Sequence, residues 1–157
     1  MRTPKKSDWA VSEVEISYKP AKHPVKITGS HTANEIFQQI WDPQLLHVQE
    51  QFYVLFLNQA NDVLCWRLIG TGTGKSCIVD NKLLATIVCK TLAHNVIIAH
   101  NHPSGNLKPS KADKQLTWQL QEMLRLFDVS VIDHLIITGN GYFSFADENL
   151  IYNPQNS

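Results

Sequence analysis

The sequence is short of cysteine and of long apolar runs, and each shortage argues against a class of protein. Its three cysteines, Cys65, Cys77 and Cys89, are odd in number and form no C-x-x-C pair. This argues against a disulfide framework and against a cysteine-based zinc site. We therefore expect the three to be small buried hydrophobic residues. No apolar run reaches the roughly eighteen residues that a membrane-spanning helix needs, so we expect no membrane span.

The chain also carries no net charge. Fourteen basic residues balance fourteen acidic ones, so the chain lacks the overall charge of a protein that coats nucleic acid. The start of the chain has no apolar signal segment, which together with the cysteine usage predicts a cytoplasmic protein. One local basic excess occurs, which we interpret as solvated surface, with nucleic-acid contact as the alternative. It consists of Arg2, Lys5, Lys6, Lys19, Lys22 and Lys26.

What is present is the composition of an ordinary globular protein, with 43% hydrophobic and 18% charged residues. A chain of 157 residues fits one domain. Segment 1–30 contains three prolines and a weak apolar alternation, so we expect an extended arm with one edge strand there. We expect the domain over 31–151 and a loose tail over 152–157.

Apolar periodicity and turn residues predict the elements of this domain. A capping box of Thr32 and Glu35 opens the first predicted helix, and Ser110 caps the longest one. The order of elements predicts a mixed α/β fold in which helices flank a central mixed β-sheet. The expected helices are 32–41, 80–92 and 111–127, and the expected strands are 50–58, 63–70, 96–99, 129–132, 135–138 and 142–145.

The residues with chemical potential are concentrated in the segment AHNHPSGNLKPSKAD, residues 99–113. His100 and His102 are two positions apart at the end of a predicted strand, so their side chains point to the same side and can share one ion. Asp113 lies in the first turn of the predicted long helix, which a tight loop can fold back over the strand end. Two imidazoles and one carboxylate suit a catalytic zinc ion, which keeps a fourth position open for water.

Each of these residues also has an ordinary structural explanation. A His-x-His pair at a strand end can be loop polarity alone. Asp113 can complete a capping box with Ser110 or complement the helix dipole. The joint pattern is far more specific than its parts: His-x-His-Pro is followed, after six residues, by Ser-x-x-Asp.

This joint pattern resembles the JAMM motif of the JAB/MPN metalloprotease superfamily, in which a distant glutamate precedes His-Ser/Thr-His-Pro and Ser-x-x-Asp. The forms HNHPSG and PSKAD are similar to the RadC-type branch, as are QEQFYVLFLN (49–58), DHLII (133–137) and YFSFADE (142–148). The resemblance covers roughly residues 32–151. It implies the three-layer, cytidine-deaminase-like α/β architecture of JAB/MPN domains.

The resemblance also implies roles for five residues. His100, His102 and Asp113 would bind one Zn²⁺ ion. Glu50 would be the general base, a role that requires a carboxylate one water away from the metal. Ser110 would position the water or stabilise the oxyanion. The alternative for Glu50 is an ordinary solvated residue at the start of a strand.

Other candidates fit less well. Glu35 and Glu122 are rival general bases, and each is better explained as helix surface. His134 could support the metal site, although a lone histidine at a strand start is more often structural. The segment 70–76 resembles a P-loop, but Ile69 stands where the first glycine is required. The HNH string does not indicate an HNH nuclease, whose three named residues are well separated.

The leading hypothesis is a zinc-dependent hydrolase of peptide or isopeptide bonds, with a protein or peptide substrate. The alternative is a DNA-repair or mobile-element module without peptidase activity, for which Lys108, Lys111 and Lys114 could contact a polyanion. A scaffold that only binds partners would not need the ligand residues. Full RadC-type proteins commonly carry an N-terminal helix-hairpin-helix-like region, for which we expect no room here. No oligomeric state is predicted.

Overall fold

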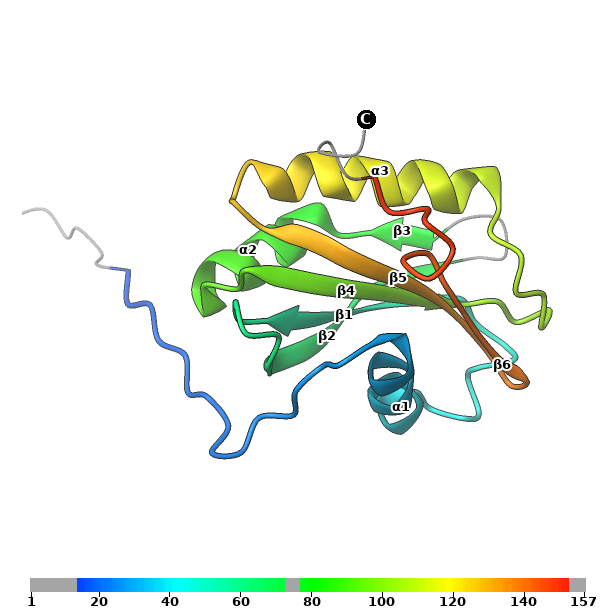
Figure 1. Ribbon diagram of the computed structural model, residues 1–157, viewed down its shortest axis with the longest axis horizontal. Coiled ribbons are helices and arrows are strands. Elements are labelled where there is room, and N and C mark those ends of the chain that lie inside the picture. Colours follow the sequence, from blue (N-terminus) through cyan, green and yellow to red (C-terminus); the bar gives the residue numbers. More distant parts are fainter. Residues whose placement is uncertain (1–13, 73–76, 153–157) are drawn as a thin grey trace, which may run out of the picture.

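The computed structural model describes residues 14–72 and 77–152. Its centre is one six-stranded sheet in the order β3-β2-β1-β4-β5-β6, made of β1 (Gln51–Leu57), β2 (Val63–Gly72), β3 (Cys77–Val79), β4 (Asn95–Asn101), β5 (Ser130–Thr138) and β6 (Gly141–Ser144) (Figure 1). Neighbouring strands are antiparallel except β4 and β5, which are parallel. The predicted mixed sheet is confirmed, as are the two predicted hairpins.

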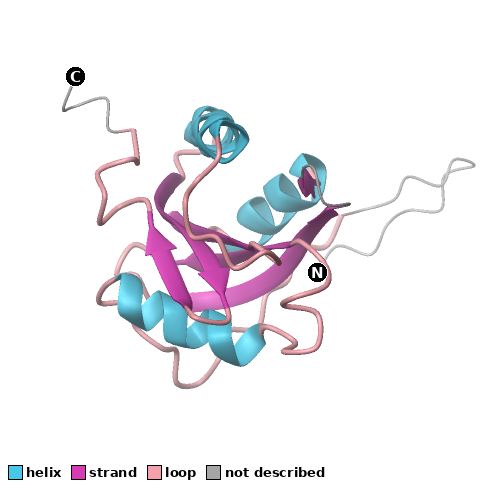
Figure 2. Cartoon of the chain, turned by 90° about the vertical axis from the view of Figure 1, so that its right-hand side faces the viewer, coloured by secondary structure: helices cyan, strands magenta, loops and turns pink. Residues whose placement is uncertain are grey.

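Helices cover both faces of this sheet, which gives three layers (Figure 2). On one face lies α1 (Ser30–Ile40), and on the other lie α2 (Asn81–Thr91) and α3 (Lys111–Arg125). The helix α3 connects the parallel strands β4 and β5, as a crossover between parallel strands requires. The mixed α/β fold with its layered architecture is therefore the one that the sequence predicts.

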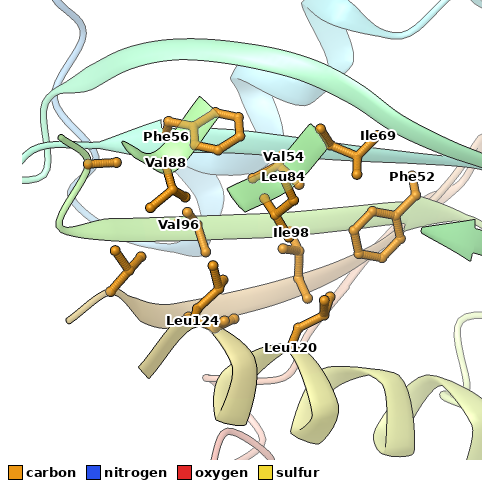
Figure 3. Packing of buried hydrophobic residues seen from close by; sticks show 13 residues of the cluster. Phe52, Val54, Phe56, Ile69, Leu84, Val88, Val96, Ile98, Leu120 and Leu124 are labelled. Atoms are coloured by element: carbon orange, nitrogen blue, oxygen red, sulfur yellow. The ribbon is translucent and has the colours of Figure 1, made fainter. Parts of the chain in front are cut away.

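The strand β1 shows how the core is divided between the two faces. All seven of its residues are buried. Phe52, Val54 and Phe56 belong to the cluster under α2 and α3 (Figure 3), whereas the three residues that alternate with them belong to the cluster under α1. A strand buried on both faces needs an apolar residue at nearly every position, which explains the continuous apolar run in the sequence.

The same alternation along β4 prepares the site. Val96 and Ile98 face α2 and α3, whereas Ile97 and Ala99 face α1. Because strand side chains alternate between faces, the next residue, His100, belongs to the α2 and α3 face. The residue after it belongs to the α1 face. Strand geometry thus places the first predicted metal ligand at the end of a rigid, buried strand.

The described residues differ from two predictions near the beginning of the chain. The helix α1 begins at Ser30, with Gly29 as an N-cap that makes no side-chain hydrogen bond. Thr32 therefore lies inside the helix, where its hydroxyl pairs with that of Thr28 at 2.8 Å, and it forms no capping box. The predicted edge strand of the arm is absent over residues 14–29, where an isolated bridge from Lys26 to Asp62 is the only β pairing.

The β pairing of the described arm is limited to this one bridge, where the Ile27 N–H donates to the Asn61 carbonyl and the Val63 N–H donates to the Val25 carbonyl. Pro24, which precedes the bridge, has no N–H with which to extend the pairing. The rest of the predicted arm, residues 1–13, and of the predicted tail, residues 153–157, lies outside the described residues. The same holds for residues 73–76 of the P-loop-like segment. Among the described residues, every helix is too short or too polar to cross a membrane.

The strand β5 corrects a third prediction. The sequence predicts two strands, 129–132 and 135–138, but one strand runs through the whole region. Val131 pairs with Val96 and Asp133 pairs with Ile97, so Ile132 is the extra residue of a β-bulge. A bulge shifts the alternation of side chains by one position. Because of this shift, the His134 side chain lies on the α3 side of the sheet, and the strand continues unbroken.

The cysteines differ from the prediction that all three are buried. Cys89 is exposed on α2, and Cys65 and Cys77 are half-buried. Burial raises the pKa of the Cys65 thiol to about 11. Cysteine is tolerated in these places as a small side chain at the edge of the core, because two of the three still pack against the apolar cluster.

Candidate metal centre

Three side chains from two elements converge at one end of the sheet. His100 is in β4, His102 is the first residue after the end of that strand, and Asp113 is in the first turn of α3. The two histidine Nε2 atoms are 2.9 Å apart. The Oδ1 atom of Asp113 lies 3.2 Å from Nε2 of His100, and its Oδ2 atom lies 3.4 Å from Nε2 of His102. The structure brings the three predicted ligands together.

These separations suit a tetrahedral metal ion. Bonds of about 2.0–2.1 Å at tetrahedral angles put neighbouring ligand atoms roughly 3.3 Å apart. The two Nε2 atoms are 2.9 Å apart, and each lies 3.2 or 3.4 Å from a different oxygen of the Asp113 carboxylate. Two imidazoles and a carboxylate are a ligand set that zinc accepts. Within the described residues, no further histidine, cysteine or acidic residue joins this group. The donor set therefore fits one metal ion with a position left for water or substrate.

Asp113 forms the predicted capping box and is also placed where it could bind a metal, the two roles that the sequence left as alternatives. Its Oδ2 atom accepts a hydrogen bond of 2.7 Å from the Ser110 backbone N–H, and its own N–H donates to Ser110 Oγ at 3.0 Å. This is the predicted capping box. The carboxylate nevertheless still faces both His100 and His102. The helix cap thus fixes the orientation of the carboxylate that the metal site needs.

The electrostatics of the centre favour an ionised carboxylate. Burial by itself raises the pKa of Asp113, but the neighbouring His100 and His102 rings and a hydrogen bond from the Ser110 N–H together lower it well below its ordinary value. The Asp113 carboxylate in turn raises the pKa of His102, against the effect of burial. Asp113 is therefore a carboxylate at neutral pH, which is the form that binds a metal.

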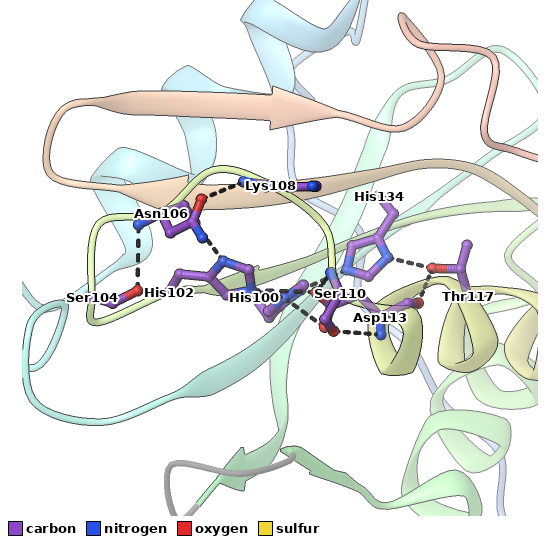
Figure 4. Close-up of polar contacts among 9 residues, drawn as sticks. All are labelled: His100, His102, Ser104, Asn106, Lys108, Ser110, Asp113, Thr117 and His134. Atoms are coloured by element: carbon purple, nitrogen blue, oxygen red, sulfur yellow. Dashed lines mark hydrogen bonds and ion pairs between the residues drawn. The ribbon is translucent and has the colours of Figure 1, made fainter.

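The second ring nitrogen of each histidine also has a partner (Figure 4). His102 Nδ1 bonds the backbone carbonyl of Asn106 in its own loop. His100 Nδ1 lies 2.7 Å from Nε2 of His134 in β5. Partners of this kind orient a metal-binding imidazole so that its other nitrogen points to the ion. Both histidines are therefore held with Nε2 directed at Asp113.

The sequence favours a structural role for His134, but the structure places it directly against His100. It is completely buried, and its ring stacks on Phe145 with the ring centres 4.5 Å apart. Burial lowers its pKa well below the ordinary value, with the neighbouring His100 acting in the same direction. The signal in the sequence is an Asp-His pair inside an otherwise apolar stretch, a pattern that predicts a break between two strands.

Glu50 and Ser110 line one open cavity with the three ligands. The cavity has a volume of about 640 Å³, and α3 forms one of its walls. Glu50 is half-buried and directly precedes β1, and Ser110 is exposed at the start of α3. Cys77 is also in this cavity, where burial first, and then the charges of Glu50 and Asp113, raise its pKa to about 12. The predicted base and hydroxyl are thus both beside the ligands.

Asn101, between the two histidines, ties the Glu50 segment to the same strand. Its buried side chain points to the α1 side, where Nδ2 donates to the carbonyls of Leu46 and Gln49 at 2.8 Å each. Its Oδ1 atom accepts from the Gln51 N–H at 2.7 Å. Gln49 and Gln51 flank Glu50 on both sides. The amide of Asn101 therefore fixes the position of the Glu50 backbone relative to the histidines.

The rival candidates lie away from the cavity. Glu35 is exposed on α1, which covers the other face of the sheet. Glu122 is on α3 and pairs with Arg125 at 2.9 Å. Both are helix-surface residues, as expected. Gly70, the start of the P-loop-like segment, belongs to β2, in a strand rather than a phosphate-binding turn before a helix.

Comparison with known proteins identifies relatives of the chain. The family model of the RadC-like JAB domain matches residues 27–150. A UPF0758 protein of Flavobacterium johnsoniae is 42% identical over 125 residues, which cover 80% of this chain and 53% of that protein. The UPF0758 protein YeeS of Escherichia coli is 42% identical over 106 residues, 66% of this chain and 70% of that protein.

A UPF0758 protein of Chlorobaculum parvum is 36% identical over 126 residues, which cover 80% of this chain and 55% of that protein. The chain thus spans about half the length of several of the curated relatives that it matches. The family match covers the whole sheet, its three covering helices and the cavity with the His-His-Asp cluster. The chain belongs to the RadC-like JAB domain family.

Proposed function

We propose that the chain is a zinc metallohydrolase that cleaves peptide or isopeptide bonds. The observation that carries this proposal is the convergence of His100, His102 and Asp113 at the wall of an open cavity that also contains Glu50. Three protein ligands with a free fourth position are typical of catalytic zinc, whereas structural zinc is closed by four.

Bound zinc would supply Lewis acidity, polarising a carbonyl and lowering the pKa of bound water to about 7. Among the residues that the structure describes, Glu50 is the one carboxylate that lines the cavity without belonging to the ligand cluster. It would accept the proton of the attacking water and return it to the leaving amine. Its strand-start position, tied to β4 through Asn101, holds it beside the ligands.

Ser110 would assist through its hydroxyl hydrogen. Its Oγ atom already accepts the hydrogen bond from the Asp113 N–H. A hydroxyl has one hydrogen to donate besides the lone pairs with which it accepts. That hydrogen remains available to an oxyanion in the cavity, where such a donor lowers the barrier most.

Metal analysis of matched variants tests the metal part of the proposal. Chelator-treated protein is equilibrated with Zn²⁺, desalted and assayed for zinc by mass spectrometry. We expect about one zinc per chain in the wild type, none in His102→Ala, and one in Glu50→Gln and in the surface control Glu35→Gln. Loss of zinc in Glu50→Gln would make Glu50 a ligand and contradict its role as the base.

A proteome-derived peptide library tests the hydrolase part. Zinc-loaded wild type should create new peptide N-termini, and zinc-loaded Glu50→Gln should not. Zinc-loaded wild type that leaves the library intact would contradict peptide hydrolysis while leaving the metal site in place. Salt-dependent binding of duplex DNA, lost on neutralising Lys108, Lys111 and Lys114, would instead favour the nucleic-acid alternative.

A further inference from the structure

A buried chain of hydrogen bonds leads away from His100 and takes no part in the chemistry described above (Figure 4). His100 Nδ1 lies 2.7 Å from His134 Nε2. His134 Nδ1 lies 2.6 Å from Thr117 Oγ1, and Thr117 Oγ1 lies 2.7 Å from the backbone carbonyl of Asp113. The chain therefore joins β4, β5 and α3 and ends on the main chain of another ligand.

The direction of every hydrogen in this chain follows from its last member. A carbonyl oxygen can only accept, so the Thr117 hydroxyl must donate its one hydrogen to Asp113. Thr117 Oγ1 must then accept from His134, which puts a hydrogen on His134 Nδ1. Thr117 and His134 are 1% and 0% exposed, so water cannot offer them other partners.

The same logic reaches the metal ligand. A neutral imidazole carries one N–H and one lone pair, so His134 Nε2 must accept, and His100 must carry its hydrogen on Nδ1. The lone pair of His100 is then on Nε2, the atom that faces Asp113 and His102. The Asn106 carbonyl imposes the same tautomer on His102. All three cluster residues thus direct lone pairs at a common point.

We propose that Thr117 and His134 are positioning residues that lock His100 in the metal-binding tautomer and thereby set the metal affinity of the centre. This inference rests on the proposed metal function, since it concerns how the same site is held. The bulge at Ile132 is part of the device because it directs His134 toward His100 and α3. Neither residue touches the reacting atoms.

Removing the Thr117 hydroxyl is the sharpest test because its hydrogen bonds go to the Asp113 main chain and to His134 and not to a ligand side chain. In Thr117→Val, His134 Nδ1–H loses its acceptor, so the ring gains by moving its hydrogen to Nε2. That hydrogen would face His100 Nδ1 and force the His100 hydrogen onto Nε2, where a metal must bind. We expect zinc affinity to fall by about 10-fold or more, as for other partners of metal-binding histidines. Thr117→Ser, which keeps the hydroxyl, should bind zinc as the wild type does.

A second pair of variants tests His134 itself. His134→Leu keeps much of the volume and removes both hydrogen-bonding atoms, and it should weaken zinc binding by about 10- to 100-fold. His134→Gln offers an acceptor to His100 and a donor to Thr117, and it should recover most of the affinity. Affinity is measured by competition with a chromogenic zinc chelator, and the Co²⁺ absorption spectrum of each variant reports the coordination geometry.

Measurements on the metal-free protein distinguish a loss of metal affinity from a loss of fold stability. Thermal unfolding of each variant in excess chelator measures the stability of the metal-free fold. If Thr117→Val lowers this stability but binds zinc like the wild type, the residue is merely structural and the inference is overturned. A wild type that binds no zinc would overturn both the proposed function and the inference, whereas equal zinc binding by all variants would overturn the inference alone.

Nuclear magnetic resonance of the wild type needs no substitution. Long-range ¹H–¹⁵N correlation spectra distinguish a protonated ring nitrogen from a bare one. In zinc-loaded protein we expect His134 to carry its hydrogen on Nδ1 and to have a bare Nε2. A hydrogen on His134 Nε2 would overturn the inference even if every variant failed to fold.

Discussion

The two histidines of the metal centre are held in different ways, although they are two residues apart. His102 is half-buried, and its Nδ1 is bound by a main-chain carbonyl four residues further along the same loop. His100 is 2% exposed, and its Nδ1 is bound by His134, a side chain 34 residues away. One ligand is therefore held by local structure and the other by tertiary structure.

This difference has a physical consequence. A carbonyl partner cannot be removed by changing a side chain, so we expect a substitution at Asn106 to leave the partner of His102 in place. The His100 side depends on buried side chains that leave unpaired polar atoms when they are changed, which costs about 1–3 kcal/mol for each atom. We expect a substitution to lower the free energy of unfolding more when the residue connects more elements that are distant in the sequence. Asn101 provides the most extreme case.

Asn101→Ala should have the largest effect. It removes three buried hydrogen bonds to the segment around Glu50, and we expect the free energy of unfolding to fall by about 3 kcal/mol. Urea unfolding in excess chelator measures this. The Gln51 amide should also exchange its hydrogen faster. The matched control is Asn95→Ala in the same strand, where only one hydrogen bond to Asn61 is lost. Equal losses in the two variants would contradict the role given to Asn101.

His100→Ala and His102→Ala should separate in stability although both lose the metal. His100 stacks on Phe52 with the ring centres 6.4 Å apart and is the donor to the buried His134. Its loss should cost the metal-free protein about 2 kcal/mol, against under about 1 kcal/mol for the more exposed His102. The same urea experiment in chelator compares them. If His102→Ala proves the more destabilising, the two sides of the centre do not differ as described.

Asn106→Ala should have the smallest effect, although Asn106 directly holds a ligand. Its carbonyl binds His102 and is retained in any substitution, and its exposed side chain only accepts from the Lys108 N–H at 3.0 Å. We expect stability to change within about 0.5 kcal/mol and zinc affinity to stay close to that of the wild type. The chelator competition assay measures the affinity. A loss as large as that of Thr117→Val would show that the loop side is as dependent on side chains as the interior side.

The sequence by itself determined what depends on neighbours within a few positions. The alternation along β4 puts His100 and His102 on one side, and Ser110 caps α3 with Asp113 in its first turn. These features follow from strand pleat and helix-end chemistry, which act within a single element. The mixed sheet flanked by helices followed from the order of such elements.

Only the tertiary structure decided how the ligands are supported. The bulge at Ile132 exists because of the pairing of β5 with β4, and it turns an apparent gap between two strands into the buried partner of His100. Thr117 meets His134 across 17 residues, and Asn101 meets Gln49 across 52. Contacts between residues so far apart in the sequence depend on packing between elements, for which a single sequence has no local signal. The candidate ligands could be predicted because their positions depend on local structure, and the residues that support them could not because those contacts depend on tertiary structure.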